Sequence, residues 1–561
     1  MFVAEATVSF ATSETEKSYE MSSFARGIYE AKYSFENQED WPDTAERVAK
    51  NVLGALGYVE EDKEYKEVRD IITDRKFIPA GRYLYAAGRE LHQVNNCYLC
   101  KAEDSREGWA DLGRKAFMVL QTGGGFGADY SNVRAAGTPI RKTGGTASGP
   151  LPLMNVINEI GRGVMQGGSR RSAILASLNW KHQDIFDFIR VKDWSPKLRE
   201  LKADDMTFPA PMDMTNISVG LDDEFFEAYN NPSNELHEHA VAVYNKVCDK
   251  MLTTAEPGFT VDTGENAGEI LRNPCGEITS KDDSDVCNLG SINIAAFDNI
   301  FEFRKAVINS ILFLLAGTVY SHLAYDEVYD VRSKNRRIGL GLMGIHEWLV
   351  KRGYGYEPND ELGKWLEVYE EASRIAADEF SFKHQLTNPV KVRSIAPTGS
   401  ISIIAETTSG IEPIFAVAYK RRIRIANAIG EDHVEYEYVI DPTAKRLIAS
   451  GATPESIEDA YSLSYDYEKR IAMQAFIQKY VDHAISSTIN LPEPITDEKE
   501  QEKFRNILMK YLPHLRGITC YPNGARGGQP LSVVPYGEAV EQQGVRYMES
   551  EETCVGGVCA L

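Results

Sequence analysis

The chain contains few cysteines for its length, with 8 thiols among 561 residues. A small secreted protein held together by disulfides carries a much denser set, so that class of protein is excluded. In a reducing compartment a cysteine pair is more often catalytic or metal-binding than structural. The positions of the thiols therefore become the main guide to function.

The chain also lacks a long apolar run and an N-terminal secretory signal. Its most apolar stretch, residues 306–320, is too short to cross a bilayer and includes Asn309, Ser310 and Thr318, so it predicts a buried helix. Residues 1–5 show no basic segment followed by an apolar one. We expect a cytoplasmic protein with no membrane partner.

Positive charge is scarce as well. Lys and Arg number 61 against 83 Asp and Glu, which gives a net charge of −22. A general nucleic-acid binder needs a basic face over most of its footprint, so nucleic acid is excluded as a partner. Any phosphate ligand must be held locally.

Three regions follow from the pattern of the remaining sequence. Residues 1–95 are mainly helical, with apolar positions three and four apart over residues 44–56. Residues 96–540 form the large α/β part, and residues 541–561 read as a flexible tail rich in glycine and acidic residues. No internal repeat is evident.

Within the large region, short β-rich runs alternate with longer helical patterns. Residues 216–219 and 394–396 predict buried strands, and residues 361–386 predict a helix. Such alternation is typical of an α/β architecture.

One pentapeptide, Asn273-Pro-Cys-Gly-Glu277, combines a thiol and a carboxylate in a loop. Side chains two residues apart in an extended segment point to the same side, so Cys275 and Glu277 could act together as a sulfur reagent and a general base. The alternative is a surface turn with a partly buried cysteine.

The other thiols differ in how much chemistry they suggest. Cys97 and Cys100 form a C-x-x-C that could be half a zinc site or a redox pair, but no second C-x-x-C follows, and Tyr98 and Leu99 between them suit a buried strand. Cys287 follows Cys275 at hairpin-like spacing.

Cys248 and Cys520 lie in patterns that predict ordinary packing. Cys554 and Cys559 flank Val-Gly-Gly-Val, and a mobile dithiol of this kind can carry reducing equivalents between sites. An unused or metal-scavenging terminus is the alternative.

One of the glycine-containing segments suggests a phosphate-binding site. The run Pro397-Thr398-Gly399-Ser400-Ile401-Ser402 offers small hydroxyl side chains and backbone N–H donors for an anion, especially where a helix begins there. Residues 123–127 and 144–145 match neither the P-loop nor G-x-G-x-x-G, and packing turns are the better interpretation.

In this order the segments resemble the catalytic subunit of ribonucleotide reductase, from about Phe77 to the C-terminus. The resemblance rests on Asn96-Cys-Tyr-Leu99 with Asp104-Ser105, Gly123-Gly-Gly-Phe-Gly127, Thr143-Gly-Gly-Thr-Ala-Ser-Gly-Pro150, Gln166-Gly-Gly-Ser-Arg-Arg171, Asn273-Pro-Cys-Gly-Glu277, Cys287-Asn-Leu-Gly-Ser-Ile-Asn293, Arg337-Ile-Gly-Leu-Gly341, Pro397-Thr-Gly-Ser-Ile-Ser402 and Ser409-Gly-Ile-Glu-Pro413.

The resemblance implies a ten-stranded α/β barrel of two parallel five-stranded halves, with the Cys275 loop as a central finger whose burial would shield a thiyl radical from water. Cys275 would abstract the ribose 3′-hydrogen, Glu277 would deprotonate the 3′-hydroxyl and Asn273 would bind the ribose. Cys97 and Cys287 would supply the electrons that remove the 2′-hydroxyl, ending as a disulfide.

Other partners follow from the same resemblance. Residues 397–402 would bind the phosphates of the ribonucleotide, taken to be a diphosphate. The tail thiols Cys554 and Cys559 would reduce the internal disulfide and be reset by a thioredoxin- or glutaredoxin-like protein.

The source of the radical can also be read. Members of the family that depend on a metal-containing radical subunit carry two adjacent tyrosines near the barrel's end, and this chain has no Tyr-Tyr pair. The sequences of residues 397–402 and 409–413 resemble those of the adenosylcobalamin-dependent class, so adenosylcobalamin is the expected cofactor. No metal bound by protein side chains is expected.

Regulation is expected from the same comparison. Asp104, Arg162 and Gln166 match the region that binds a deoxynucleoside triphosphate effector, and residues 192–205 would relay its effect. No ATP-cone pattern is recognised at the N-terminus, and a homodimer is expected.

Three alternatives stay open. The chain could be a class I type subunit with a diverged tyrosine relay, a dithiol redox or zinc-binding protein built on Cys97, Cys100 and the tail pair, or a nucleotide-binding protein without catalysis.

Overall fold

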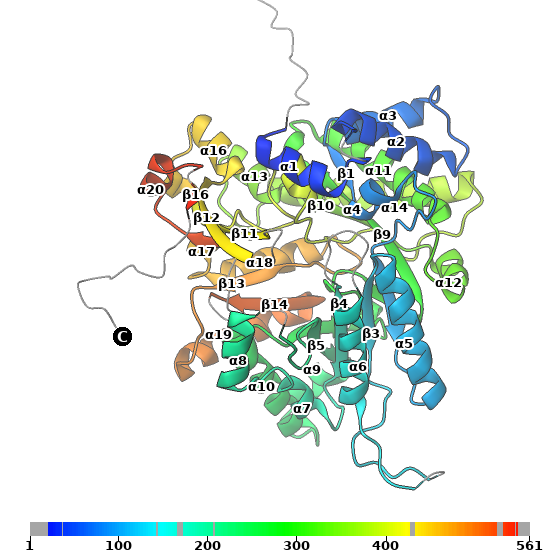
Figure 1. Cartoon of the computed structure of the whole chain (residues 1–561), viewed down its shortest axis with the longest axis vertical. Helices are drawn as coiled ribbons and strands as arrows, with labels where there is room; N and C mark the ends of the chain where they lie inside the picture. Colours follow the sequence, from blue (N-terminus) through cyan, green and yellow to red (C-terminus); the bar gives the residue numbers. More distant parts are fainter. Residues whose placement is uncertain are drawn as a thin grey trace, which may run out of the picture.

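The computed structural model describes residues 21–35, 38–141, 144–164, 172–205, 208–426, 432–523, 531–544 and 546–547. Figure 1 shows the N-terminal helices packed against one end of a large strand-and-helix body, with the N-terminal third of that body at the opposite end. None of the described helices is both long and apolar enough to cross a bilayer.

The N-terminal region is mainly helical, as expected from its periodicity. Its elements are α1 (Ser23–Lys32), α2 (Trp41–Gly54), α3 (Lys63–Thr73), the short strand β1 (Phe77–Pro79) and α4 (Gly81–Ala86). Asp40 starts α2 through a capping box with Asp43, which satisfies N–H groups at the helix start. The apolar face of α2, including Val48 and Val52, is buried in the same core cluster as α11 (Ile300–Tyr320).

The helix α11 confirms the buried helix predicted from the most apolar stretch. It is apolar on all sides, and residues from Phe303 to Thr318 are almost all buried. A helix that is hydrophobic all round belongs inside the protein, which explains why it lies beneath the N-terminal helices.

The first half of the barrel is a parallel five-stranded sheet. Its strands are β2 (Cys97–Lys101), β3 (Gly125–Asp129), β4 (Ile174–Asn179), β5 (Thr215–Asp222) and β6 (Gly258–Asp262), each hydrogen-bonded in parallel to the next. The connecting helices are α5 (Arg106–Gln121), α6 (Pro150–Gly163), α7 (Ile185–Ile189), α8 (Pro196–Asp204), α9 (Asp223–Asn230) and α10 (His237–Thr254).

The second half is also parallel and joins the first at both edges. It contains β9 (Asp285–Asn293), β10 (Ile338–Met343), the segment 393–395, β13 (Thr488–Leu491) and β14 (Gly517–Pro522). The strand β9 is antiparallel to β2, and β14 is antiparallel to β6. The expected ten-stranded barrel of two parallel halves is thereby confirmed.

The predicted strand at residues 394–396 is only partly formed. Arg393 and Ile395 make isolated parallel bridges to Leu340 and Ile485. The Asp482 carboxylate accepts the backbone N–H of Arg393 at 2.8 Å, as well as that of the preceding residue. The Asp482 side chain thus accepts backbone N–H groups that would form strand-to-strand hydrogen bonds in a regular sheet.

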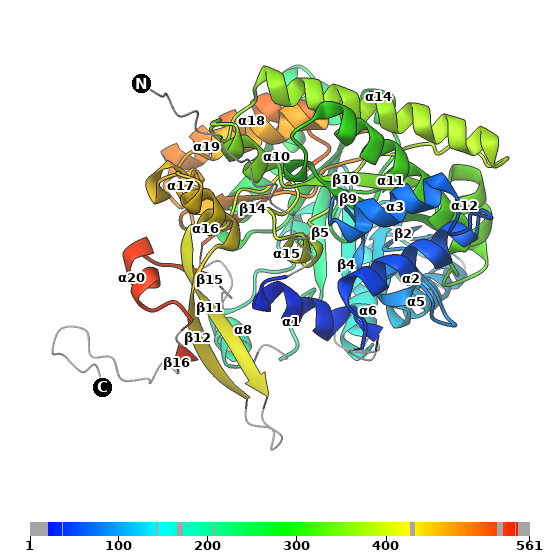
Figure 2. The same cartoon turned by 90° about the horizontal axis from the view of Figure 1, so that it is seen from above.

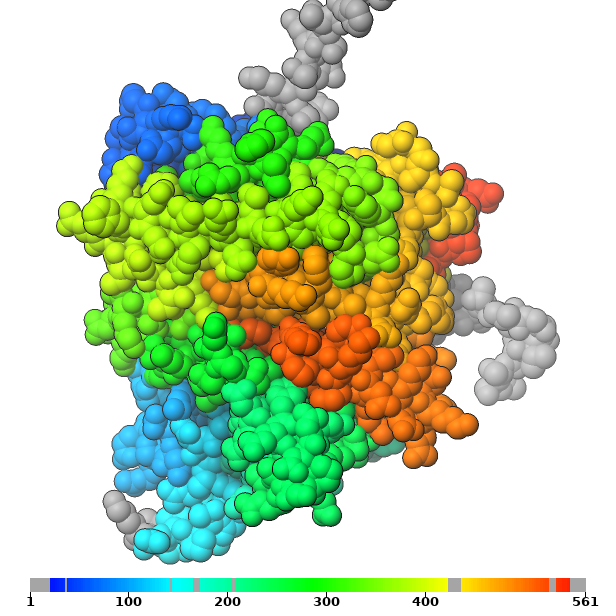
Figure 3. All heavy atoms as spheres, turned by 180° about the vertical axis from the view of Figure 1, so that it is seen from behind, coloured from blue at the N-terminus to red at the C-terminus, as the bar shows by residue number. Residues whose placement is uncertain are grey.

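The remaining helices cover the second half. They are α12 (Glu327–Asn335), α13 (Ile345–Lys351), α14 (Asp360–Lys383), α15 (Ile401–Ala405), α18 (Tyr467–Gln478) and α19 (Glu498–Tyr511), with single 3₁₀ turns at Gly264–Asn266, Ile294–Ala296, Pro454–Ser456 and Leu512–His514. The helix predicted over 361–386 is α14. Figure 3 shows the rear face, where segments from α14, α18, α19 and α10 form a continuous surface.

A small antiparallel sheet projects from one side of the barrel. It contains β11 (Ala418–Ala426), β12 (Asp432–Ile440), β15 (Leu531–Val533) and β16 (Arg546–Tyr547), accompanied by α16 (Pro442–Ala449), α17 (Ala460–Leu463) and α20 (Tyr536–Glu541). Figure 2 shows the long β11–β12 hairpin extending past α8. The strand β16 pairs with β12, so this part of the segment assigned to the tail adds to a sheet.

A two-stranded hairpin occupies the barrel interior. Its strands are β7 (Leu271–Arg272) and β8 (Thr279–Ser280), and β7 contacts β2, β3 and β4. A Cβ atom added at Gly127 of β3 would lie 1.7 Å from the Arg272 carbonyl oxygen. Residues 125–127, interpreted above as part of a packing turn, are therefore strand residues, and the missing side chains of Gly125 and Gly127 give the finger loop its room.

Candidate active site

The finger loop presents its residues on a tight turn. The Gly276 N–H donates to the Asn273 carbonyl oxygen at 2.9 Å, and Gly276 has a φ of 81°, which favours glycine. The local expectation of an extended segment is therefore wrong. The turn leaves Glu277 buried and Cys275 exposed, although both residues line one cavity.

Two further thiols face each other beside the finger. Cys97 of β2 and Cys287 of β9 are directly opposed in the antiparallel register, and both are buried. Directly opposed residues on antiparallel strands have Cα atoms about 4.5–5.5 Å apart, which is within the range that a disulfide spans. Burial raises the pKa of both thiols, so each is held as a protonated thiol.

Asn273 links the finger to this thiol pair. Its side-chain amide donates to Cys97 Sγ at 3.1 Å, and its amide oxygen accepts the Ile278 N–H at 2.9 Å. The first contact fixes Cys97 against the finger, and the second closes the loop around Glu277.

Glu277 is the buried carboxyl of the site. Burial raises its pKa to about 7, although hydrogen bonds from Asn273, the backbone and Cys97 act in the opposite direction. Its Oε2 has no hydrogen-bond partner among the described residues. The Ala484 N–H and the Ser394 hydroxyl donate to its backbone carbonyl at 2.9 and 3.3 Å, so the residue is held from behind while one carboxyl oxygen stays available.

A cavity of about 340 Å³ brings these groups together. Its lining includes Cys97, Asn273, Cys275 and Glu277 from the finger and β2, and the segment 396–401. Cys275 is exposed because the turn directs it toward this space, which corrects the expectation that its thiol is shielded by burial.

A second cavity of about 260 Å³ shares Pro274, Cys275 and Pro397 with the first. Most of its other lining residues come from β5, β6, β14 and the segment 485–488. Thr260 Oγ1 and Ser487 Oγ belong to these lining residues and have no hydrogen-bond partner among the described residues. Cys275 therefore stands between two cavities.

The segment 397–402 forms one wall of the first cavity. Thr398 has a φ of 55°, an uncommon left-handed conformation for a β-branched residue, and its hydroxyl accepts the Gly410 N–H at 2.9 Å. No backbone carbonyl in the described part of the chain accepts the N–H groups of Gly399, Ser400 and Ile401. The short helix α15 begins at Ile401.

Two of the effector candidates, Asp104 and Arg162, line neither of these cavities. Asp104 accepts from Arg134 Nε at 2.7 Å. Arg162, on α6, pairs with Asp213, which also accepts from Lys202 Nζ at 2.6 Å. Lys202 belongs to α8, within the predicted relay segment 192–205.

Several predicted residues take other positions. Cys100 lies three residues after Cys97, on the opposite face of β2, with its Sγ 3.4 Å from the Tyr325 hydroxyl. The two thiols therefore cannot share one zinc ion or one disulfide. Cys248 and Cys520 are buried in the same core cluster, as predicted. Gln166, Cys554 and Cys559 lie outside the described residues.

Sequence reasoning missed the residues that hold Glu277 from behind. Ser394 and Ala484 belong to the irregular strand segments of the second half-barrel. Neither has a motif of its own. Only the closed barrel brings them beneath the finger.

Comparisons with known proteins agree on one family. The sequence profile described as "Ribonucleotide reductase, barrel domain" matches residues 95–255, 237–371 and 381–517. A Mycobacterium tuberculosis protein named vitamin B12-dependent ribonucleoside-diphosphate reductase is 29% identical over 528 residues, covering 82% of this chain and 72% of the relative.

Two other relatives are more distant. An adenosylcobalamin-dependent ribonucleoside-triphosphate reductase of Euglena gracilis is 24% identical, covering 78% of this chain and 62% of the relative. The solved class Id ribonucleotide reductase alpha subunit of Actinobacillus ureae matches with a TM-score of 0.71 at 16% identity, covering 89% of this chain and 97% of the other. The last likeness concerns the fold.

Proposed function

Since the chain belongs to the ribonucleotide reductase family, we propose that it reduces ribonucleoside diphosphates to 2′-deoxyribonucleotides by thiyl-radical chemistry at Cys275. One observation carries the proposal: Cys97, Asn273, Cys275 and Glu277 line a single cavity, and Cys287 is directly opposed to Cys97. The diphosphate is chosen because the M. tuberculosis relative bears that name.

The proposed reaction divides among five side chains. The Cys275 sulfur takes the 3′-hydrogen of the ribose, and Glu277 accepts the proton of the 3′-hydroxyl. Asn273 orients the ribose. A carboxyl with a pKa of about 7 can accept a proton near neutral pH, and the free Oε2 faces no competing partner in the described residues.

The thiol pair supplies the reducing equivalents. Cys97 and Cys287 each give up one proton and one electron, the 2′-hydroxyl leaves as water, and the two sulfurs end as a disulfide. Their high pKa values suit this role, because a protonated thiol can donate to the departing hydroxyl. The hydrogen taken by Cys275 returns to C3′ at the end of the cycle.

We expect the nucleoside part of adenosylcobalamin, and not the whole cofactor, to occupy the second cavity. There Thr260 and Ser487 would offer it buried hydroxyls next to Cys275. The bound cofactor would supply the radical that converts the Cys275 thiol to a thiyl. The vitamin B12-dependent and adenosylcobalamin-dependent relatives support this choice.

Substrate phosphates, regulation and reduction complete the proposal. The segment 397–402 would bind the phosphates through its N–H groups and hydroxyls. Asp104, Arg162 and Gln166 would bind the effector in a homodimer, and the Asp213 pairing of Arg162 and Lys202 supports a connection from α6 to the relay segment. Cys554 and Cys559 would reduce the internal disulfide and be restored by a thioredoxin-like protein.

An anaerobic assay tests the function and the radical source together. Ribonucleoside diphosphate and a dithiol are incubated with the protein, with and without adenosylcobalamin. We expect deoxyribonucleotide only when adenosylcobalamin is present. Activity that needs a separate metal-containing subunit instead would establish the class I alternative, and no reduction under either condition would refute the proposed activity.

A further inference from the structure

The N-terminal helix α1 brings a cation to the proposed phosphate-binding segment. Lys32, the last residue of α1, donates from Nζ to the Ser400 hydroxyl at 3.1 Å. The next residue, Tyr33, is buried and lines the same cavity as Cys275 and Ser400. Figure 2 shows α1 beside α15, and the two helices are in contact.

The position of α1 is fixed by contacts other than the Lys32 hydrogen bond. The Ser22 N–H donates to Glu406 Oε1 at 3.0 Å, directly after α15. Arg75 donates from Nη1 to the other Glu406 oxygen at 2.9 Å and to the Ile404 carbonyl at 3.1 Å. Glu406 therefore holds the start of α1 through Ser22 and is itself held by Arg75. Lys32 extends from a helix whose position is already fixed.

The proposed phosphate-binding segment has no positive charge of its own, and Lys32 brings one to it. The segment 397–402 contains no charged side chain, and the protein carries a net charge of −22. A nucleotide with two or three phosphates brings several more negative charges into the cavity. Backbone N–H groups and hydroxyls can orient the phosphates but leave that charge uncompensated, whereas a lysine ammonium is a compact cation that binds phosphate well.

We propose that Lys32 is a substrate-binding residue that contacts the phosphate groups of the nucleotide, so that α1 completes the pocket. This inference rests on the proposed function, because it takes the occupant of the pocket to be a ribonucleotide. An ammonium group has three donors, so Lys32 can keep its bond to Ser400 while it binds a phosphate oxygen. The pocket would then favour nucleotides over nucleosides through a residue that lies far from the barrel motifs in the sequence.

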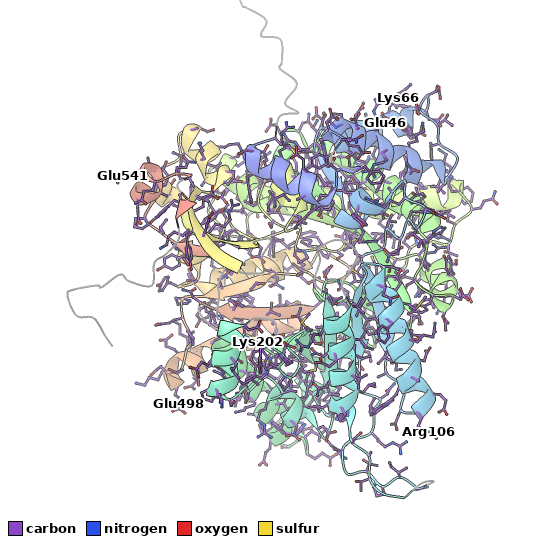
Figure 4. The ribbon with its side chains drawn as sticks, in the orientation of Figure 1. Glu46, Lys66, Arg106, Lys202, Glu498 and Glu541 are labelled. Atoms are coloured by element: carbon purple, nitrogen blue, oxygen red, sulfur yellow. The ribbon has the colours of Figure 1, made fainter. Side chains whose placement is uncertain are left out.

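The first test measures binding by equilibrium dialysis with cytidine, CMP, CDP and CTP. The proteins are the wild type, Lys32→Met, Lys32→Arg and the control Lys66→Met. Lys66 is an exposed lysine of the same N-terminal region, whose Nζ donates to the Glu61 carbonyl, and Figure 4 shows it at the outer edge of the helices.

We expect Lys32→Met to weaken CDP binding about tenfold, the low end of what a hydrogen bond to a charged group contributes, because Lys32 is exposed. The loss should fall from CDP to CMP and vanish for cytidine. Lys32→Arg should keep most of the affinity, and Lys66→Met should match the wild type.

Two results would overturn the inference alone. Equal losses for cytidine and CDP would mean that Lys32 acts only by holding α1 in position, and unchanged CDP affinity would mean that it does not contact phosphate. Retained cytidine binding in Lys32→Met shows that the pocket is intact. A wild type that binds none of the four compounds would refute the proposed function as well as the inference.

The second test uses turnover. Lys32→Met should raise KM for the diphosphate by a similar factor and leave kcat within about twofold, because the lysine contacts the phosphates in ground and transition states alike. A fall in kcat at unchanged KM would contradict a binding role.

Discussion

Replacing Glu277 by glutamine should make the protein more stable and inactive, and the gain in stability should depend on pH. The pKa of the Glu277 carboxyl rises from its usual 4.5 to about 7 because the group is buried. Each pKa unit corresponds to about 1.4 kcal/mol, so the fold favours the neutral carboxyl over the carboxylate by about 3 kcal/mol. Glutamine has nearly the same shape and never carries the charge.

The sign follows from which form the folded state prefers. Below pH 4.5 the carboxyl is neutral in both the folded and unfolded states, and its contribution to stability is fully present. As the pH rises toward 7, the unfolded state ionises first, so the folded state loses that contribution. Between pH 5 and pH 8 the wild type should lose about 2–3 kcal/mol from this group, whereas Glu277→Gln should not.

The measurement compares urea unfolding of the two proteins at pH 5 and pH 8, followed by tryptophan fluorescence. The advantage of Glu277→Gln should be about 2–3 kcal/mol larger at pH 8 than at pH 5. Taking the difference between two pH values removes contacts that change equally at both. Glu541→Gln makes the same substitution at an exposed position at the end of α20, labelled in Figure 4, and is the control.

Turnover completes the test. A general base contributes about 100-fold or more, so Glu277→Gln should lose at least that much activity at pH 8. The wild-type rate should rise with pH through about 7, as the carboxyl ionises. A stability advantage that is the same at pH 5 and pH 8 would refute the reasoning, since Glu277 would then not ionise near neutral pH in the folded protein.

Three other variants test separate parts of the site. Cys275→Ala should abolish turnover and leave nucleotide binding unchanged, measured by dialysis, because only the chemistry needs the thiol; repeated turnover would contradict its role. Gly127→Ala should destabilise the protein by several kcal/mol in urea unfolding and remove activity, since the added Cβ would collide with the finger backbone at 1.7 Å, whereas Gly113→Ala, with its nearest neighbour at 3.9 Å, should be tolerated. The double variant Cys554→Ser/Cys559→Ser should lose turnover with thioredoxin but keep it with a small dithiol; full activity with thioredoxin would exclude the tail as shuttle.

Much of the fold could be predicted from the sequence because the signals were local and strong. The helices α2, α11 and α14 follow from apolar spacing, and the barrel follows from the family resemblance. The irregularity of the strand predicted at 394–396 could not be predicted, because it depends on Asp482, which lies about ninety residues away in the sequence and accepts backbone N–H groups of the strand.

The candidate site, too, could be predicted only in part. Residue types and order indicated which side chains belong together, and in the structure Cys97 and Cys287 are directly opposed. The predicted conformation of the finger was wrong in detail, because the structure has a turn ending at Gly276 where an extended segment was expected. The pentapeptide alone allowed a turn as the alternative, but the room for that turn inside the barrel depends on Gly127, on another strand.

The turn also explains how one loop can serve two cavities. An extended finger would direct Cys275 and Glu277 into the same space, and the thiol would meet only the substrate. The turn instead leaves Cys275 on the border of both cavities while Glu277 stays buried on one side, near Cys97. A radical centre must face its source and its substrate in turn, whereas a base needs to face only the substrate. The asymmetry between the exposed thiol and the buried carboxyl therefore matches the different tasks proposed for them.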